Sequence, residues 1–292
     1  MSNPVFENSP YFGERRQQRA TTPNGYPSHP GYAPQAGTTY QQAPAVDQVQ
    51  HLEQAYQQPS AGPAQTGRMT YDDVIIKTGG LLALVVAMGA LNWFVLGGHP
   101  LATFGGLAVG LVLGLVNAFK REPSPALIVG YAAAEGLFLG GISMVFESLY
   151  PGIVLQAVLA TGATFVATLL LFSSGAVRVT PKLTRFVLIA LVGYALFSLV
   201  NLGIMLFGSG DAAFGLRTSV EIMGIPLGVI VGVFAVGLAA ICLIMDFDAI
   251  KRGVEGGIPS RFAWSAAFGL LVTLVWLYLE FLRLLAILRG GD

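Results

Sequence analysis

The sequence contains little charge and almost no cysteine. Asp, Glu, Lys and Arg make up 11% of its 292 residues, which is about half the share found in an average soluble domain. The 16 basic and 16 acidic residues balance, so there is no excess of positive charge for binding nucleic acid. Because Cys242 is the single cysteine, a disulfide framework within one chain is excluded. Together with a mean hydropathy of +0.65, this composition indicates an integral membrane protein.

Residue patterns for several kinds of catalysis and cofactor binding are also missing. None of the three histidines lies in an apolar stretch, which disfavours haem ligation and histidine-based zinc catalysis. The pair Ser173 and Ser174 has no histidine partner in the membrane, so an intramembrane serine protease is not indicated. No lysine lies in the middle of a span to form a retinal Schiff base, and no glycine-rich phosphate loop with lysine occurs. We therefore predict that the protein is not an enzyme and binds no cofactor.

Residues 1–68 differ in composition from the rest of the chain. They are rich in Gln, Pro, Tyr, Ser and Gly and have few large aliphatic side chains. Such a segment buries too little surface to offset the entropy lost on ordering, so we predict a disordered cytosolic tail over 1–68. We predict a transmembrane domain over 69–292. Thr70 is the expected N-cap of its first helix, followed by Asp72 and Asp73 in the first turn, where carboxylates suit the helix dipole.

Seven apolar stretches follow, each close to or above the roughly 20 residues that a helix needs to cross a bilayer. They lie at 76–97, 101–119, 126–146, 151–173, 184–207, 225–245 and 263–288. Polar and apolar residues do not alternate along them, which argues against the strands of a membrane barrel. The sequence therefore predicts an all-α membrane protein with seven transmembrane helices.

Basic residues favour one orientation of these helices. One set of span ends carries most of them, namely Arg68, Lys77, Lys120, Arg121, Arg178, Lys182, Arg185, Lys251, Arg252 and Arg261. The opposite connections hold only Arg217 and His99, and Arg289 follows the last span. By the positive-inside rule, we expect the N-terminus in the cytosol and, with seven spans, the C-terminus outside.

Glycines recur at a spacing that lets helices approach closely. The repeats are Gly106, Gly110 and Gly114, then Gly136 and Gly140, then Gly228 and Gly232. Small residues four apart are common at helix contacts in membranes. We favour compact packing within one chain over a dimer face, and so expect a monomer or a weak oligomer.

Glu280 is the most informative residue of the sequence. It lies within the last apolar stretch, about 12 Å before Leu288 along the helix axis. A carboxylate in hydrocarbon is costly, and such residues usually have a partner and face a protein interior or a water-filled path. Arg283 lies three residues later on the same helical face. Glu280 is therefore either half of a structural pair with Arg283 or part of an ion or proton site.

Three further acids lie in or beside the apolar stretches. Asp246 and Asp248 follow the sixth stretch directly, and Asp246 is the better candidate for an inward-facing group. If Asp246 and Glu280 approach each other, they would share a proton or bind a hard cation such as calcium weakly, and would titrate as a coupled unit. Glu135, about nine residues into the third stretch, either lines a path or bonds to a neighbouring helix.

Three segments resemble one known family, the transmembrane Bax inhibitor motif proteins, which are called YccA-like in bacteria. DFDAI after the sixth stretch and YLEFLRLL in the seventh are similar to the two settings in which this Bax inhibitor family carries an acid. GYAAAEGLFLGGIS is similar to the family's third span. The resemblance covers about 70–289, so the tail is expected to lie outside the family core.

This resemblance implies a seven-helix fold whose last helix is central and wrapped by the other six. It also implies a pH-sensitive calcium leak in the bacterial inner membrane, gated by a pair of acids, here Asp246 and Glu280, that binds calcium weakly. In related proteins an arginine after the second span can join the gate, and Lys120 and Arg121 lie in that region. From their positions in the sequence alone, Arg283 and Asp248 are further candidate gate partners. The partners implied are the lipid bilayer, calcium ions and protons.

Two other functions stay open. One is a membrane regulator without transport that acts on a protease or in a stress response, because relatives in the resembled family are associated with stress protection and with modulation of a membrane protease. Its partner would be a membrane protease or another membrane protein. A proton-coupled secondary transporter would use Glu135, Asp246 and Glu280 as a proton relay, although no inverted repeat is obvious.

Overall fold

The computed structural model describes residues 67–207 and 214–290. Within these ranges, seven helices are long and apolar enough to cross a membrane, which confirms the predicted all-α membrane fold. The predicted disordered tail lies outside the described residues, apart from its last two positions.

The helices follow one another with short connections. They are α3 (Tyr71–Ala90) with its π-helical end η1 (Leu91–Val95), α4 (Pro100–Phe119), α5 (Pro125–Leu149), α6 (Ile153–Ser173), α7 (Pro181–Phe207), α9 (Leu227–Glu255) and α10 (Ala263–Arg289). Between α7 and α9 lie the short helix α8 (Leu216–Ser219) and the antiparallel pair β1 (Glu221–Ile222) and β2 (Ile225–Pro226). The 3-10 turn η2 (Ser260–Phe262) precedes α10.

Thr70 caps α3 as the sequence predicts. Its Oγ1 accepts a hydrogen bond from the Asp73 N–H at 3.1 Å, and the Asp73 carboxylate accepts one from the Thr70 N–H at 3.1 Å. This reciprocal capping box satisfies two backbone donors that a helix start would otherwise leave free.

Helix α9 is longer than the predicted sixth span, which ended at residue 245. It continues to Glu255, and the ion pairs Asp248–Arg252 and Lys251–Glu255 at i,i+4 spacing support this polar extension. The prediction that Asp246 closes the helix was therefore wrong. Asp246 lies inside α9, on a surface that packs against α10.

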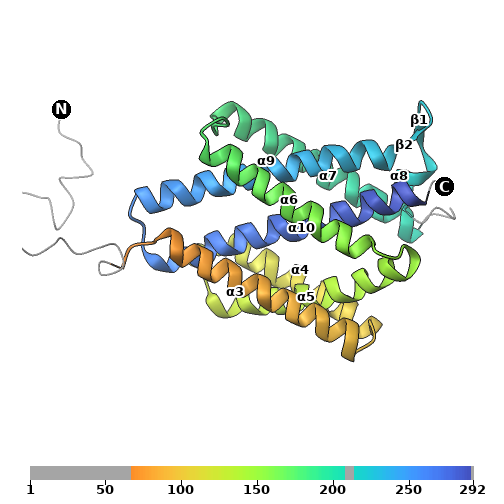
Figure 1. The fold of residues 1–292 in the computed structure, drawn as a ribbon, viewed down its shortest axis with the longest axis horizontal. Coiled ribbons are helices and arrows are strands. Elements are labelled where there is room, and N and C mark those ends of the chain that lie inside the picture. The colour runs from red at the N-terminus through yellow and green to blue at the C-terminus, as the bar shows by residue number, and fades with distance from the viewer. Residues whose placement is uncertain (1–66, 208–213, 291–292) are drawn as a thin grey trace, which may run out of the picture. The chain divides into compact units, whose positions relative to one another are not determined.

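Helix α10 is the most buried of the seven spans and lies at the centre of the described bundle. It packs directly against α3, α5, α6 and α9. Figure 1 shows it between α3, α4 and α5 on one side and α6, α7 and α9 on the other. Helix α4 packs mainly on α5, and α7 mainly on α9, so these two form an outer layer. The predicted central position of the last helix is confirmed.

The glycine repeats lie at helix contacts within this chain. Gly106, Gly110 and Gly114 face α5, Gly136 and Gly140 face α3, and Gly228 and Gly232 face α10 or α8. The tightest of these contacts joins α3 and α5, where a Cβ on Gly140 would come within 2.7 Å of the Gly89 Cα. The expected role of these residues in internal close packing is confirmed.

We expect Gly140→Ala to lower the thermal unfolding midpoint of the detergent-solubilised protein. The added methyl group would overlap the Gly89 backbone and push α3 away from α5, an overpacking cost of about 1–3 kcal/mol. Gly105→Ala in α4 is the matched control, because a Cβ there meets no atom within 4 Å and alanine has the higher helix propensity. Equal midpoints for the two variants would contradict the assigned close contact.

Candidate functional site

Glu280 lies on α10 and is 1% exposed. Its Oε1 accepts hydrogen bonds from Arg283 Nη1 at 2.7 Å, from Trp276 Nε1 at 3.3 Å and from the Tyr194 hydroxyl. Arg283 and Trp276 come from the same helix, about one turn away on either side, whereas Tyr194 comes from α7. The Glu280–Arg283 pair is therefore formed, and it belongs to a larger network.

Arg217 of α8 is the second ion-pair partner of Glu280. It belongs to a connection between two spans, yet it is 2% exposed. Its Nη1 lies 3.6 Å from Glu280 Oε2, and its Nη2 donates to the Tyr194 hydroxyl at 3.0 Å and to Ser198 Oγ at 3.3 Å. The guanidinium also lies 5.6 Å from the ring centroid of Tyr194 and 5.5 Å from that of Phe197, within cation–π range.

The chain around α8 holds Arg217 in this inward position. The buried Asn201 of α7 accepts a hydrogen bond through Oδ1 from the Leu216 N–H at 2.8 Å. Gly215 has a φ of +59°, a conformation that glycine adopts without steric cost. At the start of α9, a Cβ on Gly228 would lie 2.8 Å from the Arg217 carbonyl oxygen, so glycine lets α8 pack onto α9.

The sequence placed Arg217 among the residues of an outer connection and gave it no role in the site. The structure corrects this, since Arg217 is as buried as the carboxylate it pairs with. One signal was available: it is the only basic residue between α7 and α9, a segment otherwise small, apolar or acidic.

The cluster of Glu280, Arg217, Arg283 and Tyr194, in which the first two are buried and the last two half-buried, carries an excess of positive charge. With the arginines and the glutamate ionised, two positive charges and one negative charge give a net charge of +1. Three donors already occupy Glu280 Oε1, and Arg217 faces Oε2. Oε2 itself accepts no hydrogen bond in the described residues, because Arg217 Nη1 lies at ion-pair distance only. A calcium ion bound at this carboxylate would lie close to two positively charged guanidinium groups, which opposes its binding.

The structure does not bring Asp246 and Glu280 together. Asp246 Oδ2 accepts a hydrogen bond from Thr273 Oγ1 at 2.8 Å. Thr273 precedes Glu280 by seven residues on α10, which corresponds to about 10 Å along the helix axis. Within the described residues no group of three or more Asp, Glu, His or Cys side chains is placed to hold a metal ion. The gating and weak calcium binding predicted for Asp246 and Glu280 stay predictions.

Of the other predicted gate partners, only Arg283 contacts Glu280. Asp248 pairs with Arg252 on its own helix. Lys120 and Arg121 are exposed at the turn between α4 and α5, and within residues 67–207 and 214–290 neither makes an ion pair.

Glu135 lies in a separate environment. It is buried on α5 and faces α4, where a Cβ on Gly110 would lie 2.8 Å from its Oε2. It lines a cavity of about 310 Å³ between α4, α5 and α10. A second cavity, of about 390 Å³, lies beside Arg217 and Arg283. Within the described residues, no direct hydrogen bond joins Glu135, Asp246 and Glu280 to one another, and the suggested proton relay stays a prediction.

The family of the chain follows from a comparison with known families. The sequence model of the family described as Bax inhibitor 1 like matches residues 3–290. The chain belongs to the Bax inhibitor 1-like family. The match begins at residue 3, so the expectation that the first 68 residues lie outside the family region was wrong. No curated protein matches this Bax inhibitor 1-like sequence.

The charge balance predicts an order of stability in this Bax inhibitor 1-like protein. Glu280→Gln leaves the buried Arg217 and the half-buried Arg283 without a carboxylate, whereas Arg217→Met leaves a neutral Glu280–Arg283 pair. We expect Glu280→Gln to cost about 3–5 kcal/mol of unfolding free energy and to be the more destabilising change, because it leaves the buried Arg217 charge without a carboxylate. The measurement is thermal or denaturant unfolding in detergent.

The control for this prediction is Arg261→Met, which removes an arginine whose side chain is 58% exposed and forms an ion pair with the exposed Glu122. Its effect should stay small, as for other exposed ion pairs. If Arg217→Met destabilised the protein more than Glu280→Gln, the assigned charge balance would be contradicted.

Proposed function

We propose that this membrane protein is a pH-sensitive calcium leak whose closed state is locked by the cluster of Glu280, Arg217, Arg283 and Tyr194. Arg217 carries the proposal, because a connecting segment inserts it 3.6 Å from a carboxylate on the central helix. Family membership supports a membrane protein of the Bax inhibitor 1 type. The calcium leak itself comes from the sequence resemblance, and the buried charges supply a way to close it.

The excess positive charge is the physical basis of the lock. A divalent cation near two guanidinium groups is repelled, and the repulsion is strong where little water screens it. Withdrawal of Arg217 together with its connection would leave Glu280 and Arg283 as a neutral pair and remove this barrier. This movement would break the contacts that hold α8, such as the Asn201–Leu216 hydrogen bond, but would displace no membrane span, because Arg217 belongs to the four-residue helix α8.

Asp246 is the carboxylate to which we assign the response to pH. Thr273 is its hydrogen-bond donor, and the neighbouring titratable group is the Cys242 thiol one turn earlier on α9. In the described residues no Lys or Arg forms an ion pair with Asp246. Protonation of Asp246 would therefore not have to break an ion pair, and its ionised form would attract calcium.

The test is calcium influx into liposomes that contain the purified full chain and a calcium dye, measured from about pH 5.5 to 8. We expect Arg217→Met to raise the influx severalfold at every pH, because it removes the lock. We expect Asp246→Asn to flatten the dependence of influx on pH. Arg261→Met is the control for loss of a positive charge and should behave as wild type.

Two outcomes would count against this proposal. An unchanged pH profile in Asp246→Asn would remove the role of Asp246. If folded wild-type protein and Arg217→Met both gave no influx above empty liposomes, the calcium leak would be rejected in favour of a regulatory membrane protein without transport.

We further propose that the protein lies in a bacterial inner membrane with its N-terminus in the cytosol. The burial of Arg217 adds support for this orientation, because it leaves one basic residue fewer exposed in the connections that the positive-inside rule places outside. Alkaline phosphatase fused after residue 292 should be active and green fluorescent protein fused there should be dark, with the reverse result for fusions before residue 1. The opposite pattern would invert the orientation.

A further inference from the structure

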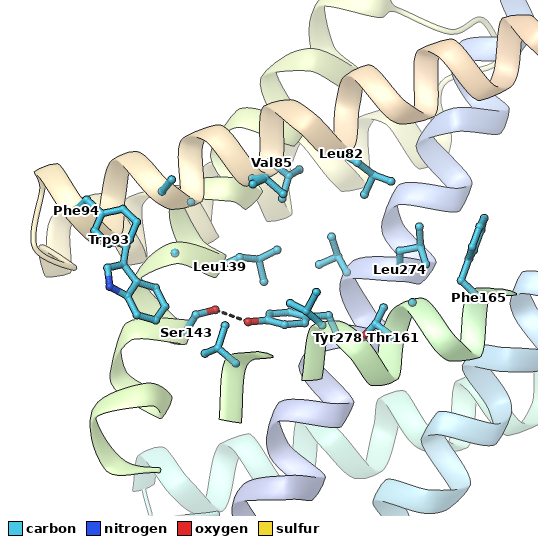
Figure 2. Close-up of a pocket in the computed structure, with 18 residues that line it drawn as sticks. Leu82, Val85, Trp93, Phe94, Leu139, Ser143, Thr161, Phe165, Leu274 and Tyr278 are labelled. Atoms are coloured by element: carbon cyan, nitrogen blue, oxygen red, sulfur yellow. Dashed lines mark hydrogen bonds between the residues drawn. The ribbon is translucent and has the colours of Figure 1, made fainter. Parts of the chain in front are cut away.

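A crevice opens between α3 and α6 and exposes the central helix. Both helices pack against α10, and between them lies a cavity of about 530 Å³ whose floor comes from α5 and α10. Figure 2 shows Trp93 and Phe94 at one end of it, Leu274 and Phe165 at the other, and Ser143 and Tyr278 on the floor. None of these residues belongs to the buried cluster around Glu280.

The lining of the crevice is apolar, and its polar side chains on α5, α6 and α10 already have partners. The Ser143 and Tyr278 hydroxyls form a hydrogen bond of 2.6 Å, and Thr161 Oγ1 donates to the Ala157 carbonyl at 2.7 Å. Aliphatic and aromatic side chains make up most of the remaining wall. A polar solute or an ion would lose its hydration here and gain little in return.

The length of the crevice matches one leaflet of a bilayer. Along α3 and η1 it runs from Leu82 to Trp93, eleven residue steps or about 16 Å along the axis. This is about half of a hydrocarbon core of roughly 30 Å. Trp93 lies two residues before the end of the span at Val95, at the depth where tryptophan is enriched beside lipid headgroups. The crevice therefore extends from one membrane interface to about the midplane.

We propose that this crevice binds one acyl chain of a bilayer phospholipid, from the leaflet on the Trp93 side. The headgroup lies at Trp93, and the chain runs along α10 to Leu274 and Phe165. A lipid chain fits because the cavity is apolar, reaches the interface at one end and ends near the midplane. The inference does not depend on the proposed calcium leak.

Native mass spectrometry of the full chain in detergent, titrated with dioleoyl phosphatidylcholine, tests the proposal. We expect wild type to retain one bound phospholipid and Gly162→Leu to lose it. Gly162 lines the crevice, and a Cβ there meets no atom within 4 Å, so the leucine side chain extends into the empty space. Val158→Phe is a second filling variant at a neighbouring position on α6.

Gly237→Leu is the matched control. Gly237 is also exposed in the middle of a helix with no atom within 4 Å of its ideal Cβ, but it lies on α9 and does not line the crevice. It should retain the lipid as wild type does. In wild type, dihexanoyl phosphatidylcholine should bind at least about tenfold more weakly than dioleoyl phosphatidylcholine, because each buried methylene adds to the affinity.

Three results would overturn the proposal. One is equal lipid retention in wild type and in a folded filling variant. Another is equal affinity of wild type for the short-chain and long-chain lipids, which needs no variant. The third is a wild-type dimer that Gly162→Leu dissociates, because that would assign the crevice to a second copy of the chain.

Discussion

A carboxylate inside a membrane protein has to be compensated, and the compensation of Glu280 organises one half of this bundle. One arginine from the same helix would have been enough to balance its charge. The second, Arg217, comes from α8, which is held by the Asn201–Leu216 hydrogen bond and by the glycine at the start of α9, and its guanidinium lies within cation–π range of two aromatic rings. The connection between α7 and α9 is thereby fixed to the central helix through a buried charge.

Helix α10 is closely packed on one side and open to a crevice on another. Glycines allow α3 to approach α5, and α9 to approach α10, until backbones touch side chains or each other. In a bilayer such contacts stabilise helix association through dispersion, because lipid supplies little hydrophobic drive. In the described bundle α3 and α6 both pack on α10 but little on each other, and between them α10 is left open to an apolar crevice. The same helix thus has a charged side and a side suited to lipid.

The sequence predicts the spans well because long apolar runs have one stable structure in a bilayer, a helix. It also identifies Glu280 and Arg283, whose spacing of three residues puts them on one face of a helix. Partners across helices are harder to predict. Asp246 and Glu280 look like a pair because they lie on consecutive spans. The depth of each residue in the membrane, however, depends on how far α9 extends and on where α10 begins. Arg217 escaped notice because a basic residue in a connection is usually solvated, and only tertiary packing reverses that expectation.

Helix α10 provides a physical link between Asp246 and the buried cluster. Thr273 and Glu280 lie seven residues apart, two turns along nearly the same face of one helix. A change at the Asp246–Thr273 contact that shifts or rotates α10 would therefore displace Glu280 relative to Arg217, because Arg217 belongs to α8. A rigid helix can transmit such a movement over about 10 Å without any proton or ion passing between the two acids. In the proposed leak, Asp246 then senses pH and the cluster around Glu280 forms the lock, and α10 connects them. The two carboxylates therefore need no direct contact.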